Sequence, residues 1–297
     1  RICGKGSVMH FDDLYQQIGP SVEGPMPLLI LTDGWLEASD TLARVRNAIV
    51  HQADLTAIAR FDTDQLLDQR ARRPMLTVVD GVTQNVDWPE LELAVGTDAD
   101  DKPFLLLHGP EPDFAWRQFG KAVANIVSAI GVTTTYSMGA YPAPMPHTRA
   151  IRISSTASDA GMIINREHTT GLITVPVGVQ VAITEELERF GVPSHGLYAQ
   201  VPYYLASHDW PQAAVAMLET FGELSGLHFD DSQLDAQVHE AVVAVNAMFE
   251  DSPGLSEVVT RLEQRYDELR KLESEKLPTG DELEEELQQY LRKIDGD

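Results

Sequence analysis

Two short apolar runs, each ending at a glycine turn, constrain the fold of this chain more than any other feature. The run LLIL at residues 28–31 leads into TDGW, and the run FLLL at residues 104–107 leads into HGPEPD. An amphipathic stretch follows each turn, an order typical of buried parallel strands that feed helices. In open α/β sheets, ligands and partners bind at the carboxyl ends of strands. The two junctions therefore locate a candidate site without identifying its chemistry.

The chain continues to alternate strands with helices up to residue 228. Further apolar runs predict strands at 75–79, 132–136, 150–154, 171–175 and 196–201. Helical spacing predicts a helix after residue 34 with Asp40 as its N-cap, and others over 116–130, 178–190 and 211–224. We therefore predict a three-layer α/β domain over residues 9–228, with a mainly parallel or mixed central sheet and helices on both faces.

From residue 229 onward the pattern is helical only. Apolar stripes predict helices over 234–249, 255–269 and 283–294, with breaks near Pro253 and Pro278. These helices define a predicted all-helical C-terminal extension over 229–297. Residues 1–8 lack periodicity and precede Met9, so we interpret them as a leader or a remnant of cloning.

The composition excludes several classes of function. The net charge of −24 would repel nucleic acid and anionic membranes over most of the surface. No apolar run approaches the length of a membrane span, and no secretory leader is recognisable. The single cysteine, Cys3, rules out an internal disulfide and a cysteine-based zinc site. We predict a cytoplasmic protein without a nucleic-acid or membrane partner.

The motifs of nucleotide and metal enzymes are missing from the sequence. No G-x-G-x-x-G follows a strand, no Walker sequence occurs, and no histidines pair at ligand spacing. The carboxylates Asp33, Glu111 and Asp113 would repel a phosphate at the two junctions. Together with Asp80 they could bind Mg²⁺, but the favoured interpretation is that each caps its own helix or turn. We therefore predict no cofactor and no metal site.

A serine and a proline-rich loop follow the strand predicted at 132–136. The sequence TYSMG around Ser137 approaches the nucleophile elbow G-x-S-x-G but lacks its first glycine, so an ordinary strand-end serine is favoured. The loop AYPAPMP at 140–146 is predicted to present Tyr141 and Met145 as an ordered contact surface, and Trp116 is a further candidate. The candidate pocket comprises Asp33, Gly34, Glu111, Asp113, Ser137 and Gly139.

Taken together, these stretches resemble the PAC2 family of proteasome assembly chaperone 2-like proteins, in its bacterial branch. The resemblance lies in residues 29–35, 103–116, 132–146, 196–204 and 230–266, and it extends from about residue 9 to 293. It implies a fold related to purine nucleoside phosphorylases and their hydrolase relatives, homo-oligomers for which a trimer is the expectation, and a protein-binding role. One departure is the C-terminal sequence DGD, where proteasome-docking relatives often carry a hydrophobic residue followed by tyrosine.

Two hypotheses of function remain open at this point. The first is a non-enzymatic protein-interaction module resembling an assembly chaperone, with a protein partner. The alternative is an enzyme that binds a nucleoside-like or carboxylate substrate in the strand-end crevice, with Asp33, Glu111, Asp113 and Ser137 in acid–base or orienting roles. The fold itself does not decide between them.

Overall fold

The computed structural model describes residues 11–34, 36–163, 167–168, 171–250 and 253–276. The chain divides into two compact units. Unit 1 comprises residues 1–143 and 151–243, and unit 2 comprises residues 144–150 and 244–297. The domain boundary at residue 228/229 stays a prediction, and residues 1–8 lie outside the described part of the chain.

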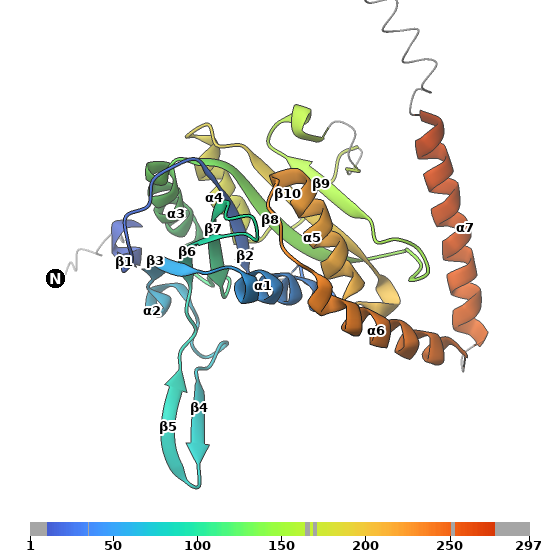
Figure 1. Cartoon of the computed structure of the whole chain (residues 1–297), viewed down its shortest axis with the longest axis horizontal. Coiled ribbons are helices and arrows are strands. Elements are labelled where there is room, and N and C mark those ends of the chain that lie inside the picture. Colours follow the sequence, from blue (N-terminus) through green and yellow to red (C-terminus); the bar gives the residue numbers. More distant parts are fainter. Residues whose placement is uncertain (1–10, 35, 164–166, 169–170, 251–252, 277–297) are drawn as a thin grey trace, which may run out of the picture. The chain divides into compact units, whose positions relative to one another are not determined.

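Unit 1 is built on a mixed sheet of eight strands (Figure 1). The four central strands run parallel to one another, and every other neighbouring pair of strands in this sheet is antiparallel. The spatial order is β1 (Tyr15–Gln17), β3 (Thr56–Phe61), β6 (Glu92–Thr97), β7 (Pro103–Gly109), β2 (Met26–Thr32), β8 (Val132–Ala143), β10 (Ser194–Pro202) and β9 (Ile153–Ala157). The parallel group is β7–β2–β8–β10.

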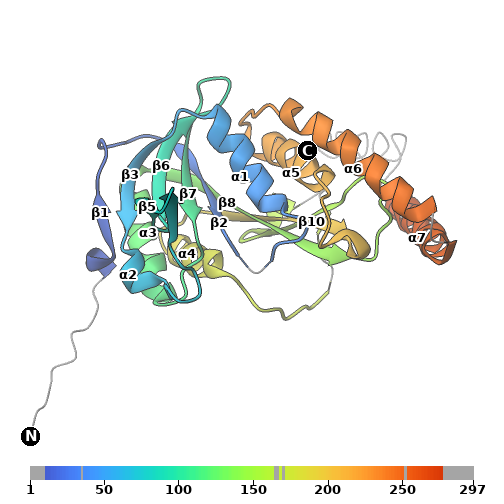
Figure 2. The same ribbon diagram turned by 90° about the horizontal axis from the view of Figure 1, so that it is seen from below.

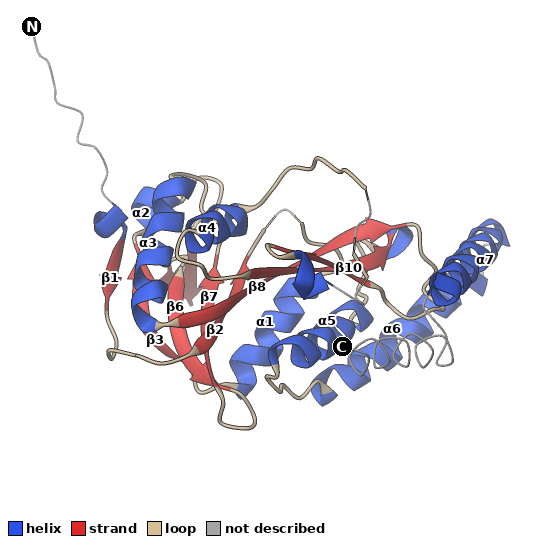
Figure 3. Ribbon diagram, turned by 90° about the horizontal axis from the view of Figure 1, so that it is seen from above, coloured by secondary structure: helices blue, strands red, loops and turns tan. Residues whose placement is uncertain are grey.

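Helices cover both faces of this sheet, as the alternating pattern predicts. The helices α3 (Trp116–Ile130) and α4 (Val179–Glu188) pack together on one face, whereas α1 (Thr41–Gln52) and α5 (Gln212–Ser225) cover the other (Figures 2 and 3). Because both faces are covered, the central strands β2 and β7 carry continuous apolar runs, at residues 28–31 and 104–107. The three-layer α/β fold with a mixed sheet is thus confirmed.

The structure corrects two of the predicted strands and places a third, which has the predicted bounds, outside the main sheet. Residues 75–79 form β4 (Met75–Val79), which pairs only with β5 (Val82–Asp87) in a separate two-stranded hairpin that extends away from the main sheet (Figure 1). Residues 171–175 form no strand, because they have no neighbouring strand to pair with. The strand predicted at 150–154 begins three residues later, as β9.

Four strands escaped the sequence analysis. They are β1, β3, β5 and β6. Helices were located more accurately, apart from the short α2 (Thr63–Leu66) and three single turns of 3₁₀-helix. Glycine ends α3 and α5 in left-handed conformations, at Gly131 and Gly226.

Unit 2 combines a loop with helical segments. The helix α6 (Ser232–Glu250) runs from unit 1 into unit 2, and α7 (Pro253–Lys276) follows it. The helix predicted at 283–294 lies outside the described residues. Among the helices that the structure describes, none combines the length and the apolar character needed to cross a bilayer.

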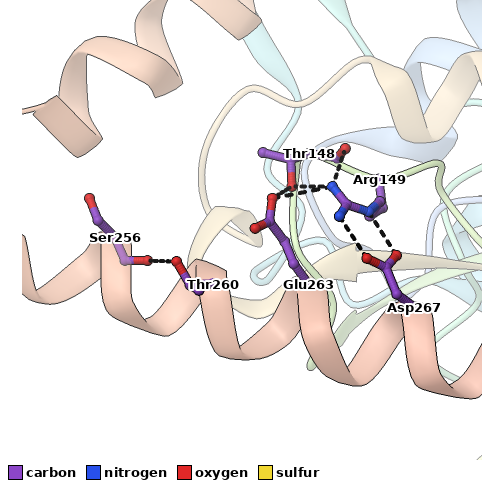
Figure 4. A network of polar contacts seen from close by, with 6 residues as sticks. All are labelled: Thr148, Arg149, Ser256, Thr260, Glu263 and Asp267. Carbon is purple, nitrogen blue, oxygen red and sulfur yellow. Dashed lines mark hydrogen bonds and ion pairs between the residues drawn. The ribbon is translucent and has the colours of Figure 1, made fainter.

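Arg149 ties the loop of residues 144–150 to α7 (Figure 4). Its guanidinium donates to both carboxylate oxygens of Asp267, at 2.9 Å from Nε and 2.8 Å from Nη2, and to Glu263 at 3.2 Å. The hydroxyl of Thr148 also bonds to Glu263, and Tyr266 donates to the carbonyl of Ala150 at 3.0 Å. This paired geometry gives the loop a fixed position on one side of α7.

Candidate functional site

The two glycine junctions lie side by side at one rim of the sheet. Strands β2 and β7 are parallel neighbours, with Leu29 opposite Leu106. Just beyond them, the backbone N–H of Asp33 donates to the carbonyl of Gly109 at 2.8 Å. Adjacent carboxyl ends of parallel strands are the usual location of a binding site in an α/β fold.

The three carboxylates at this rim are each bonded to a different partner. Asp33 forms an ion pair with Arg46. Asp113 accepts from the backbone N–H of Asp68 at 2.7 Å and forms an ion pair with Arg72. Neither carboxylate caps its own helix or turn as the sequence analysis favoured, because Arg46 lies within α1, and Asp68 and Arg72 lie in the segment after α2.

Glu111 holds the start of α4. One of its carboxylate oxygens accepts from the backbone N–H of Val179 at 2.7 Å, and burial raises the pKa of this carboxyl above its usual value. The positive end of α4 therefore already faces a carboxylate. An anionic ligand would have to displace that carboxylate.

A four-carboxylate magnesium site does not form. Asp80 lies in the turn of the β4–β5 hairpin, away from the main sheet (Figure 1). Across the described residues, no group of three histidine, cysteine or acidic side chains comes close enough to hold a metal ion.

Ser137 lies inside β8 and not at a tight turn. Its side chain is buried, and it bonds to the hydroxyl of Tyr198 on the neighbouring strand β10. The nucleophile elbow of α/β-hydrolases needs a serine on a strained turn between a strand and a helix. The position of Ser137 therefore agrees with an ordinary strand serine.

A cavity of about 420 Å³ opens beside these strands in unit 1. Its floor carries Tyr198 of β10, Tyr141 of β8 and two hydroxyl residues of β9, Ser154 and Thr156. Of the predicted pocket residues, Gly139 lies directly beneath Tyr198, and Gly34 borders a much smaller adjoining space. Sequence analysis missed Tyr198, although the alternation of apolar Leu197, Ala199 and Val201 with Tyr198 and Gln200 along β10 is a signal that the two faces of this strand differ.

The three predicted contact residues are placed differently from the expectation. Tyr141 belongs to β8, which continues to Ala143, and its ring faces the cavity. Met145 is only 2% exposed, so it presents no surface for a partner. Trp116 is half-buried, and its indole N–H donates to the carbonyl of Pro112 at 2.5 Å. The proline loop is therefore shorter and less accessible than its sequence suggests.

Among the described residues, the segment with the most exposed large apolar side chains is the β4–β5 hairpin with the residue that follows it. Seven large apolar side chains between residues 75 and 88 are 39 to 69% exposed. They are Met75, Leu76, Val78, Val79, Val82, Val86 and Trp88. We call this segment the apolar hairpin. Because successive strand residues point to opposite faces, both of its faces are apolar.

The sequence matches the model of the PAC2 family over residues 31–248. This stretch is well over half of the chain and contains the central sheet from the end of β2 to β10. The chain belongs to the PAC2 family. A search of curated proteins gave no match.

Solved structures support the same assignment. A protein of unknown function from Corynebacterium glutamicum is 27% identical, with a TM-score of 0.81 over 86% of this chain and 97% of that one. One from Mycobacterium tuberculosis, also of unknown function, is 28% identical, with a TM-score of 0.80 over 89% and 92%. A proteasome-assembly chaperone homologue from M. tuberculosis shares the fold at 22% identity, with a TM-score of 0.70 over 80% and 99%. This PAC2 protein thus has the fold of assembly-chaperone homologues.

Proposed function

We propose that this PAC2 protein is a non-enzymatic protein-interaction module that resembles an assembly chaperone and associates with copies of itself. The apolar hairpin is the observation that carries the proposal. A contiguous exposed apolar surface is a mark of a protein–protein contact. A two-stranded hairpin is also marginally stable by itself in water, so it gains stability when another chain covers it.

A second copy of this chain is the partner that fits the hairpin. Arg70 and Arg73 are exposed at its base, and the chain as a whole carries a net charge of −24. The acidic surface of another copy therefore complements this local positive charge. The apolar strands supply the contact area, and the two arginines would orient the second copy against the hairpin.

The relatives support a protein-binding role of the same kind. Two structural neighbours are described as a proteasome-assembly chaperone homologue and an archaeal proteasome activator. A trimer and a cytoplasmic location stay predictions from the sequence. The described candidate residues give no support to the enzyme alternative, because Asp33, Glu111 and Asp113 each bond to a different partner and Ser137 lies within a strand.

Sedimentation velocity over a range of protein concentrations tests the proposal. The parent chain should form oligomers, and the double variant Val78→Asp/Val82→Asp should shift them to smaller species, because buried carboxylates oppose the contact. Val243→Asp on α6 is the matched control, since Val243 is 56% exposed against 52 and 59% for the hairpin valines. The control should keep the parent's mass. A monomeric parent, or a double variant of unchanged mass, would contradict self-association through the hairpin.

A further inference from the structure

The cavity beside β8 and β10 differs from the rest of this acidic protein because its lining carries no charge. Twelve residues line it, and none of them is acidic or basic. Two other cavities of similar volume, about 450 and 390 Å³, each include charged side chains. A volume of about 420 Å³ lies in the range of small-molecule sites, which are mostly apolar with a few polar groups.

Glycines make room for the tyrosine at the floor of this cavity. Tyr198 lies opposite Gly139 on β8 and Ser154 on β9. A Cβ atom at Gly139 would come within 2.8 Å of the Tyr198 ring, and one at Gly196 within 3.0 Å of its hydroxyl oxygen. Larger residues at either position would push Tyr198 up into the cavity. The two glycines thus keep the space open and the tyrosine flat against the sheet.

The polar groups of the floor are hydroxyls that are held in place. The Tyr198 hydroxyl bonds to Ser137 and Thr156. The hydroxyls of Tyr141 and Ser154 lie 3.2 Å apart, and Gln200 donates to Ser154 at 2.8 Å. A hydroxyl can both donate and accept, so this group can bond to a hydroxyl or a carbonyl of a ligand.

The wall opposite the floor is an apolar segment that water still reaches. Ile173, Val175 and Val177 line the cavity and are 48 to 59% exposed. They belong to residues 171–178, which form neither helix nor strand. A ligand with an apolar body would remove these side chains from water, which is the usual source of affinity in such sites.

Among the described residues that line the cavity, none is charged and could pair with an ionic ligand. The start of α4 at Gly178 and Val179 is already bonded to Glu111. Arg152, which adjoins the floor through Gln200 and Glu167, forms an ion pair with Glu167 at 2.6 Å. An anionic or cationic head group would therefore lose its hydration without gaining an opposite charge.

We propose that this cavity binds an uncharged small molecule that has an apolar body and a single hydroxyl or carbonyl group. Its apolar body contacts Ile173, Val175 and Val177, and its polar group bonds to the hydroxyls of Tyr198, Tyr141 and Ser154. This binding site is independent of the hairpin contact, so the two proposals can fail separately.

Binding of an uncharged fluorescent probe, N-phenyl-1-naphthylamine, tests the site. The full chain should bind it saturably with one site per chain. Val175→Asp, which places a charge on the wall, should weaken binding by about tenfold. Val82→Asp on the hairpin is the matched control, because both valines are 59% exposed, and it should change binding by less than about twofold. An equal loss in the two variants, or no saturable binding, would overturn the proposal.

Competition against the same probe tests the class of ligand. At pH 8, 1-decanol should displace the probe at a concentration about tenfold lower than decanoate, because the lining offers no cation. Tyr198→Phe should remove part of the alcohol's advantage over decane in displacing the probe. Equal displacement by decanoate and decanol would contradict the uncharged ligand. An unchanged alcohol preference in Tyr198→Phe would contradict the role of the floor hydroxyls.

Discussion

At the scale of single residues, the start of α1 shows how a carboxylate from outside a helix can replace the expected cap. Asp40 precedes the helix but makes no side-chain cap bond, and it has a left-handed backbone with φ of 52°. Glu37 takes this role instead, since its carboxylate accepts from the backbone N–H of Leu42 at 3.0 and 3.2 Å. Burial is the main cause that raises the pKa of Glu37 to about 7, and the bonds to the helix only partly oppose it.

This raised pKa predicts that Glu37 makes folding less favourable as the pH rises. The folded state holds the proton more tightly than the unfolded state, so the free energy of unfolding falls between about pH 4.5 and 7. Glu37→Gln keeps an acceptor but cannot ionise. The free energy of unfolding of this variant should exceed that of the parent by an amount that grows across this window. The difference should reach about 1–2 kcal/mol at pH 8, a value reduced for partial solvent screening.

Urea denaturation at several pH values measures this difference. Glu219→Gln on the exposed surface of α5 is the control for loss of a surface carboxylate, and it should change the free energy of unfolding by less than about 0.5 kcal/mol. If the difference in free energy of unfolding between Glu37→Gln and the parent does not change with pH, Glu37 has an ordinary carboxyl pKa in the folded protein, and the prediction is wrong.

At the scale of elements, the packing of α3 on α4 depends on one glycine. A Cβ atom at Gly120 would lie 2.3 Å from the carbonyl oxygen of Ala182 in α4, and this oxygen cannot move without the helix. Gly120→Ala should therefore lower the free energy of unfolding by about 1–3 kcal/mol, although alanine is the better helix former. The midpoint of urea denaturation measures the loss. The same change at Gly254 in α7, where a Cβ meets nothing within 4 Å, should cause none.

The sequence predicts elements well where burial alone determines them. Residues 28–31 and 104–107 are apolar on both faces because they lie in the middle of the sheet. The strands β3 and β6 carry Arg60 and Glu92 and pair antiparallel towards one edge, so their apolar signal is weaker. Residues 171–175 have strand-like composition but no pairing partner, and composition cannot supply one.

The candidate site was predictable only at its rim. The glycine junctions located the ends of β2 and β7 correctly, because adjacent parallel strands end together. The cavity, by contrast, combines side chains from β8, β9, β10 and residues 173–181, which come together only when the sheet order is known. The alternation along β10 marks the face that carries Tyr198, but the place of Tyr198 in the cavity follows only once Gly139 is known to lie opposite it.

At the scale of the whole molecule, the net charge of −24 opposes the self-association that the apolar hairpin favours. Like charges on two copies repel, and salt screens this repulsion over about 8–10 Å at physiological strength. Salt at this ionic strength does not weaken apolar contacts. The balance between the two effects therefore depends on ionic strength in a defined direction.

We predict that oligomers of this protein become more stable as the salt concentration rises. Raising sodium chloride from about 50 to about 500 mM should tighten self-association by roughly threefold or more, since exposed charges more than a Debye length apart become screened. Sedimentation velocity at fixed protein concentration measures the shift, and the Val78→Asp/Val82→Asp variant should not show it. If oligomers instead dissociate in high salt, ion pairs dominate the interface, and the arginines at the base of the hairpin would contribute more than its apolar strands.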